Sequence, residues 1–309
     1  MSERVSGERS SFRTVTMLVA IPLCGMAIFF LWQWLNGGIT PEEAFEETKS
    51  ALVTGDTPRT IAAAPAAKAE IAPLERALPR VTPKKAKPSP GGRGDIVLII
   101  DDLGFDGQPL ERLMALDPNV NVAILPNGTR ATEFANRLHA RGFEVLCHLP
   151  MQPRGKETPG RNAILTSMSD EEIARLTREN IEAIPHARGV NNHMGSLATS
   201  DRRVMASVIG AIPDGMYFID SRTAGGSVAG EVAREMNVRT ATRHIFLDDT
   251  QSEAAVRRQL AELAAAARKN GVAVGIGHPY PVTMRVLADE LPSLRADGFR
   301  LVRASSVVR

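Results

Sequence analysis

Short apolar runs recur between Asp95 and Arg309 and alternate with segments that have the composition of helices. The runs are mostly apolar along their whole length, which is typical of strands buried on both faces of a parallel sheet. The runs are Ile96–Ile100, Val120–Leu125, Phe143–Cys147, Gly189–Val190, Tyr217–Ile219, Ile245–Leu247, Val272–Ile276 and Arg300–Val302. Seven or eight such units favour a closed or nearly closed barrel over a small open sheet. The predicted fold class is therefore α/β, a distorted (β/α)7-8 barrel.

Capping signals delimit several helices between these runs. They predict helices over Ala131–Ala140, from the capping box Ser169-Asp170-Glu171-Glu172 to about Ala183, from Thr199-Ser200-Asp201 onward, and over Ser252–Lys269 before Gly271.

Polar residues with catalytic potential follow most of the apolar runs. They are Asp101-Asp102, His148, Asn191-Asn192-His193, Asp220-Ser221-Arg222, Asp248-Asp249 and Gly277-His278. In a β/α barrel the carboxyl ends of all strands meet at one face, where active sites form. Loops are polar in general, but that does not explain why three of the six histidines and two carboxylate pairs fall there. The sequence predicts an active site at this face.

A carboxylate and two imidazoles with one open position form a typical catalytic site for zinc or another divalent ion. Asp102, His148 and His193 are the predicted set. Consecutive strand residues point to opposite sides, so Asp101 and Asp102 reach one site only where the chain turns at the strand end. The alternatives are a helix cap or a solvated pair for the two aspartates, and hydrogen-bonded core positions for the histidines.

The strings IIDDLGFD, VLCHLPMQP, GVNNHMGS, YFIDSRT and GIGHPY occur in this order along the chain. In that order they resemble the polysaccharide deacetylase superfamily, and more closely its divergent branch. The resemblance covers residues 95–309. It implies a barrel of the polysaccharide deacetylase type, a divalent metal for which zinc is the expected ion, and hydrolysis of N-acetyl groups on polymeric sugars.

The resemblance also implies roles for individual residues. Asp101 corresponds to the general base, Asp102 to the metal-binding carboxylate and His148 to the first histidine of a His-x-x-x-His motif. The second histidine of that motif would fall at position 152, where this chain has Gln152. Either His193 completes the metal site in its place, or the site is weakened.

The remaining carried-over roles concern the acid and the substrate. His278 corresponds to the general acid and Asp220 to the carboxylate that orients it. Arg222 has no secure counterpart; it is predicted to bind an anionic substrate group or to position Asp101. Asn192 is predicted to contact substrate.

The first 94 residues differ in texture from the rest. Residues 1–14 carry arginines, Val15–Leu35 carries no charge, and 36–94 is rich in Pro, Ala and Lys. The apolar segment is long enough for a helix to cross the ~30 Å bilayer core, and the arginines before it predict a cytoplasmic N-terminus. We therefore predict a single-pass inner-membrane anchor, a flexible linker and a periplasmic domain over 95–309. A cleaved signal peptide is the alternative.

The formal net charge is +2, from 37 basic and 35 acidic residues, which gives no electrostatic case for nucleic-acid binding. The predicted function is a metal-dependent N-deacetylase acting on a cell-envelope polysaccharide or peptidoglycan. A catalytically weak or inactive module that binds cell-wall glycan or an envelope partner is the main alternative, because fold does not imply function. A hydrolase of another ester or amide is the third.

Overall fold

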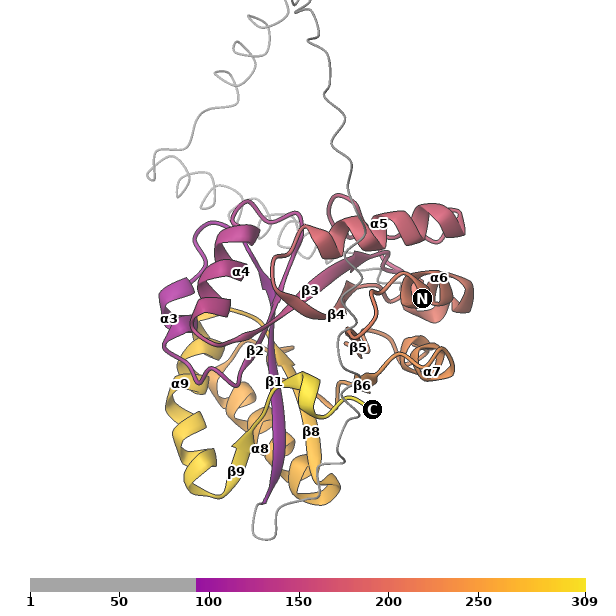
Figure 1. Ribbon diagram of the computed structural model, residues 1–309. Helices are drawn as coiled ribbons and strands as arrows, with labels where there is room; N and C mark the ends of the chain where they lie inside the picture. The colour runs from indigo at the N-terminus through magenta and orange to yellow at the C-terminus, as the bar shows by residue number, and fades with distance from the viewer. Residues whose placement is uncertain (1–92) are drawn as a thin grey trace, which may run out of the picture. The chain divides into compact units, whose positions relative to one another are not determined.

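The apolar run Ile96–Ile100 forms the middle of strand β1 (Gly94–Leu103) in the computed structural model, which describes residues 93–309 (Figure 1). All five side chains of this run are fully buried. Val97 and Ile99 point into the curl of the sheet, while Ile96, Leu98 and Ile100 belong to the layer under the helices. Two-sided burial explains why the run is continuously apolar.

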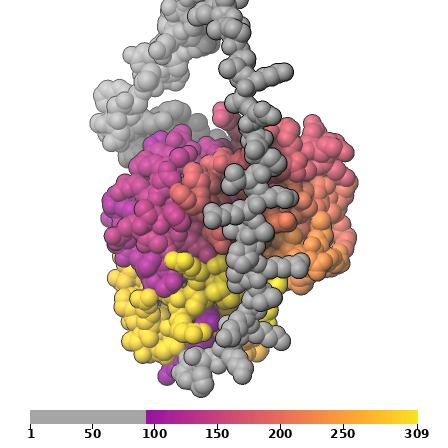
Figure 2. All heavy atoms as spheres, in the orientation of Figure 1, coloured from indigo at the N-terminus to yellow at the C-terminus, as the bar shows by residue number. Residues whose placement is uncertain are grey.

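β1 is central in a nine-stranded sheet in which the strands pair in parallel. The strand order is β6-β5-β4-β3-β2-β1-β8-β7, and β9 pairs with β1. The other strands are β2 (Asn121–Ile124), β3 (Glu144–Met151), β4 (Ala187–Met194), β5 (Tyr217–Asp220), β6 (Thr240–Thr242), β7 (Ile245–Phe246), β8 (Val272–Gly277) and β9 (Phe299–Leu301). Because β8 and β9 pair with β1, the two ends of the domain lie together. Figure 2 shows this on one face, where the yellow C-terminal part adjoins the magenta part near the start of the domain.

The sheet curls into a half-barrel. Its end strands β6 and β7 are separated in sequence only by Arg243 and His244, yet no pairing between these two strands is formed. Instead, Arg243 N–H donates to the Asp220 carbonyl and His244 N–H donates to the Val274 carbonyl. The expected parallel α/β sheet is therefore present, but it is an open half-barrel of nine strands rather than a closed or nearly closed barrel of seven or eight units.

Helices cover the outer side of the curl (Figure 1). The predicted caps are confirmed: Ser169 and Glu172 form a reciprocal capping box, Asp201 and Ser252 accept N-terminal backbone N–H groups, and Gly271 ends its helix with φ 81°. The helices are α3 (Leu110–Met114), α4 (Ala131–Ala140), α5 (Asp170–Glu182), α6 (Arg202–Gly210), α7 (Ala229–Glu235), α8 (Glu253–Asn270) and α9 (Pro281–Ala296), with 3-10 turns η1 (Ala198–Ser200) and η2 (Ala304–Ser306).

The amino-terminal edge of the sheet is closed by the segment that contains η2. Glu144, which is 6% exposed, accepts hydrogen bonds from Tyr217 Oη at 2.8 Å and from the backbone N–H of Ser305 at 2.8 Å. Ala304 and Val308 pack with the apolar side chains inside the curl. This buried polar network fixes one end of the half-barrel and leaves the opposite end for the candidate site.

The predicted cytoplasmic segment, membrane anchor and linker lie outside the described residues. Within residues 93–309, none of the helices combines the length and the apolar character that crossing a membrane requires.

Candidate metal centre

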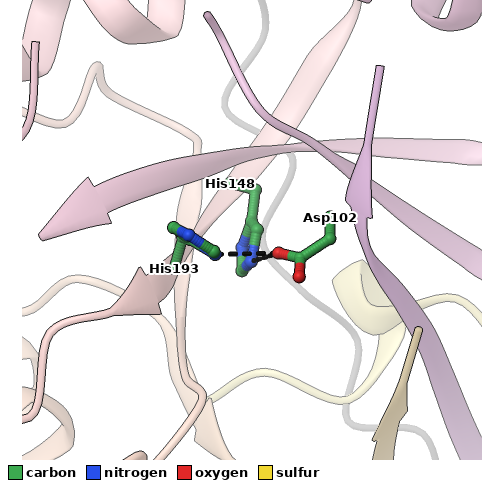
Figure 3. Close-up of side chains that lie close together, drawn as sticks. All are labelled: Asp102, His148 and His193. Carbon is green, nitrogen blue, oxygen red and sulfur yellow. Dashed lines mark ion pairs between the residues drawn. The ribbon is translucent and has the colours of Figure 1, made fainter. Parts of the chain in front are cut away.

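Asp102, His148 and His193 meet at the carboxyl edge of the sheet, although β1, β3 and β4 supply them from distant parts of the chain (Figure 3). One donor atom from each residue lies within 4.8 Å of the other two. Asp102 Oδ1 is 3.1 Å from His148 Nε2 and 2.8 Å from His193 Nδ1. The three residues predicted as metal ligands are therefore brought together, and no other such group of His, Cys, Asp or Glu was found within residues 93–309.

A β-bulge explains how two consecutive aspartates face this site. Ile100 pairs with Val122 and Leu103 pairs with Ile124, so two residues of β1 lie opposite one residue of β2. The backbone of Asp102 has a φ of 59°, which is a left-handed conformation. This conformation is energetically unfavourable for any residue other than glycine. Strain of this kind is concentrated at functional sites. The bulge places the buried Asp101 beside the ligand set, with its Oδ2 3.6 Å from His148 Nε2.

Asn191 connects Asp101 to His148, and sequence reasoning assigned it no role. Its Nδ2 donates to Asp101 Oδ1 at 2.9 Å, and its Oδ1 is 2.9 Å from His148 Nδ1. The second contact fixes the imidazole so that Nε2 faces the carboxylates; metal-ligating histidines are commonly oriented by such a hydrogen bond to the other ring nitrogen. Asn191 and His193 are two residues apart on β4, and that spacing puts them on one face of the strand.

The prediction that Asn192 contacts substrate is wrong. Its side chain is fully buried. Its Nδ2 donates to the Met194 carbonyl and its Oδ1 accepts from the Ser221 backbone N–H. Asn192 alternates with Asn191 and His193 along β4 and points away from the site, where it holds the ends of β4 and β5 together.

Asp220 does not contact His278, contrary to prediction. The carboxylate that does so is Asp248, whose Oδ1 is 2.9 Å from His278 Nδ1 and whose Oδ2 accepts from the His278 backbone N–H at 2.6 Å. Asp248 follows β7, the sheet neighbour of the strand that carries His278, whereas β5 is not adjacent to β8. Asp220 accepts instead from the Arg222 backbone N–H and from Ser227 Oγ.

Neither Gln152 nor Arg222 belongs to the three-residue ligand set. Gln152 turns away from the three ligands, and its Oε1 accepts from Thr166 N and Thr166 Oγ1. Arg222 is exposed after β5 with φ 49°, and its side chain makes no ion pair within residues 93–309. Its predicted role toward substrate stays a prediction.

Opposite pKa shifts separate the two neighbouring aspartates. Burial dominates at Asp101 and raises its pKa, against the lowering effects of His148 and His278. At Asp102 burial also raises the pKa, but the adjacent imidazoles of His148 and His193 outweigh it and hold that pKa well below its ordinary value. Asp102 is therefore the permanently ionised partner, and Asp101 is the one suited to gain and lose a proton.

The pKa values of His148 and His278 are both raised, toward the charged imidazolium. Burial lowers the pKa of His148, but Asp101 and Asp102 outweigh it and raise that pKa to about 9. For His278, burial is likewise outweighed by the hydrogen bond to Asp248 and the charges of Asp101 and Asp102, which raise its pKa. His278 Nε2 faces the ligand set at 3.7 Å from Asp102 Oδ2.

The donor set fits a divalent cation. Asp102 Oδ1 is buried and makes no hydrogen bond of acceptable geometry, although two imidazole nitrogens lie close to it. A buried oxygen without a hydrogen-bond donor is costly unless a cation satisfies it. One carboxylate and two imidazoles are a common three-ligand set for catalytic zinc.

Comparison with known proteins identifies the family. A model of the divergent polysaccharide deacetylase family matches residues 98–308. The chain belongs to this family. The resemblance seen in the sequence is thereby confirmed for residues 98–308, which include Asp102, His148 and His193.

Two proteins of related sequence and one solved structure resemble this chain. The uncharacterized protein YibQ of Escherichia coli K12 is 39% identical over 221 residues, which span 71% of this chain and 69% of YibQ. An uncharacterized protein of Haemophilus influenzae is 36% identical over 203 residues, 65% of this chain and 72% of that protein. The crystal structure of uncharacterized protein ATU2773 from Agrobacterium tumefaciens C58 superposes with a TM-score of 0.68 at 22% identity, covering 72% of this chain and 92% of that one. That structure shares the fold.

Proposed function

We propose that this domain is a metal-dependent hydrolase that removes N-acetyl groups from a polysaccharide of the cell envelope. The observation that carries the proposal is the meeting of Asp102, His148 and His193 beside two proton-transfer groups, Asp101 and His278, at one edge of the sheet. Membership of the divergent polysaccharide deacetylase family supports the substrate class.

Asp102, His148 and His193 are the residues that would hold the ion, and zinc suits their mixed oxygen and nitrogen donors. A bound divalent ion would supply Lewis-acid activation of the water and of the amide carbonyl. Asn191 keeps His148 oriented, and Gln152 takes no part because Thr166 occupies its side-chain oxygen. The site is therefore complete without a histidine at position 152.

Asp101 is the proposed general base. Its Oδ1 is held by Asn191, while Oδ2 faces the ligand set. Burial raises its pKa and so makes proton uptake from the attacking water more favourable than at an exposed aspartate. The water would give a proton to Asp101 as its oxygen bonds to the amide carbon. The C–N bond would then break as the nitrogen takes a proton from His278, and the products would be acetate and a free amine.

His278 is the proposed general acid. Its Nδ1 is held by Asp248, so Nε2 is the nitrogen that faces the reacting groups. Its raised pKa keeps a larger fraction protonated near neutral pH, which suits donation to the departing amine. Thr283 Oγ1 donates to the same aspartate at 2.8 Å and helps to hold the pair in place.

The proposed location follows from the sequence of the first 94 residues. The uncharged segment Val15–Leu35 and the preceding arginines support a membrane anchor with the domain on the periplasmic side, where envelope glycan lies. A periplasm-dependent reporter fused after Arg309 should be active, whereas activity of a reporter that works only in the cytoplasm would contradict this orientation.

Acetate release tests the proposed activity directly. The zinc-loaded full chain should release acetate from peptidoglycan or another N-acetylated glycan, and Asp101→Asn should abolish release while the metal stays bound. A chain that binds zinc and glycan but releases no acetate from any N-acetylated polymer would contradict the activity and favour a glycan-binding module.

A further inference from the structure

The partly exposed aromatic rings of the domain gather on one side of the metal centre. Among the phenylalanines and tyrosines of residues 93–309, five are buried: Phe134, Phe143, Tyr217, Phe218 and Phe299. The other three, Phe105, Phe246 and Tyr280, are half-buried. They lie just after β1, at the end of β7 and just after β8, which are neighbouring strands. The phenylalanine and tyrosine rings of these residues are therefore buried, except for the three at the carboxyl edge of the sheet.

Among these three half-buried rings, Tyr280 is the one that carries a hydroxyl. Its centroid lies 5.4 Å from that of His278, with the planes tilted by 35°. Phe246 packs edge-on against the same imidazole at 5.3 Å and carries the Arg243 guanidinium over its own face. The Tyr280 hydroxyl makes no hydrogen bond to any residue of 93–309. It remains available to a ligand as donor and acceptor.

The backbone fixes the position of Tyr280 at the start of helix α9. Pro279 and Pro281 flank it, and it takes φ −65° and ψ 143° as the N-cap residue. The side chain makes no capping hydrogen bond. Helices α3, α4 and α7 also begin without a side-chain cap, whereas Ser169, Asp201 and Ser252 cap α5, α6 and α8. Tyrosine is a poor N-cap residue, so the Tyr280 side chain adds little to the start of α9.

The position of the reacting nitrogen determines what this ring can touch. If His278 Nε2 protonates the leaving amine, the carbon that carries the nitrogen is one C–N bond, ~1.5 Å, farther away. In an acetylated amino sugar that carbon belongs to the pyranose ring. The Tyr280 ring adjoins His278, so the sugar and the phenol would be neighbours.

We infer that Tyr280 is a substrate-contacting residue, whose ring receives the pyranose of an N-acetylated amino sugar and whose hydroxyl bonds to a sugar hydroxyl. This inference rests on the proposed function for the direction of the leaving amine. Within that proposed substrate class it assigns recognition of the sugar ring to Tyr280, because an acetylated linear amine offers no pyranose face to the aromatic side chain.

Glycan binding measured without turnover tests the inference. The zinc-loaded full chain carrying Asp101→Asn is titrated calorimetrically with the β-1,4-linked tetramer of N-acetylglucosamine. Adding Tyr280→Ser should weaken binding by roughly 3- to 10-fold, the contribution expected of one aromatic contact. Tyr280→Phe should lose less, since it keeps the ring. Met236→Ala, at a 41% exposed residue that ends α7, is the control and should bind like the parent.

Thermal unfolding separates this role from a structural one. Serine is a preferred N-cap, so Tyr280→Ser should unfold at the same or a higher temperature than the parent while it binds the tetramer more weakly. A lower Tm with unchanged affinity would show that the tyrosine is structural and overturn the inference. Absence of measurable binding by the parent at millimolar tetramer would overturn it too.

The outcomes distinguish this inference from the proposed activity. If the wild-type chain releases no acetate but the Tyr280-dependent affinity is found, the sugar contact stands and the hydrolase proposal fails. If acetate is released from glycans with the same KM by wild type and by Tyr280→Ser, the hydrolase proposal stands and the contact is wrong.

Discussion

Replacing Asp248 by asparagine removes one charge from the proposed acid without changing the size of the side chain. Asp248 is 2% exposed and accepts three hydrogen bonds, from His278 Nδ1, from the His278 backbone N–H and from Thr283 Oγ1. The amide of Asp248→Asn fills the same space, so the fold should persist. The chief loss is the charge that stabilises the imidazolium of His278.

The size of the effect follows from this one contact. A buried hydrogen bond to a charged group contributes about 1.5–3 kcal/mol. Since one pKa unit corresponds to about 1.4 kcal/mol, the pKa of His278 should fall by about one to two units. The acid form exists below that pKa and is lost as the pH rises through it. The alkaline limb of kcat/KM should therefore move to lower pH by the same amount.

The assay is the pH dependence of acetate release by the zinc-loaded full chain. Asp220→Asn is the matched control, because Asp220 is also buried but contacts Arg222 and Ser227 rather than His278. Its alkaline limb should stay at the wild-type pH. A shift in Asp220→Asn, or an unshifted limb in Asp248→Asn with metal still bound, would refute this account of the acid.

Three further predictions concern stability. Tyr217→Phe removes the hydroxyl that donates to the buried Glu144 and should lower the free energy of unfolding, measured in urea, by about 1.5–3 kcal/mol. An unchanged free energy of unfolding would show that this network contributes little to stability. Gly271→Ala should lower the free energy of unfolding by about 1–2 kcal/mol. The cause is the φ of 81° alone, because a Cβ added at this position would have no atom within 4 Å. Unchanged stability would contradict the left-handed cap. Free zinc at 100 times its Kd should stabilise the chain by about 2.7 kcal/mol, a gain that a chelator reverses, whereas a Tm independent of zinc would argue against specific binding.

The sequence predicted the sheet well where burial on both faces leaves a continuous apolar run, as at Ile96–Ile100 in β1. It missed β6 (Thr240–Thr242), a three-residue edge strand without such a run. It also overestimated closure of the barrel, because pairing between the end strands is not encoded in any one run. Local caps such as Ser252 and Gly271 were predictable, since a cap depends on a few neighbouring residues.

The candidate metal centre was predictable because each of its three residues lies in the carboxyl half of its own strand, and parallel strands end at one edge. The partner of His278 was not, since the chain order does not reveal that β7 lies next to β8 and β5 does not. The choice between Asn191 and Asn192 depended on which of two alternating faces points to the site. One signal was present: residues two apart from His193 share its face, and this favours Asn191.

The metal content of the purified chain tests the central claim most directly. We predict one tightly bound divalent ion per wild-type chain and the same for Gln152→Ala, whose side chain contacts Thr166 rather than the ligands. His148→Ala and His193→Ala should each lose tight binding, while Asp101→Asn should retain it. Unchanged binding in His193→Ala, or loss of the ion in Gln152→Ala, would contradict the assignment of Asp102, His148 and His193 as the metal ligands.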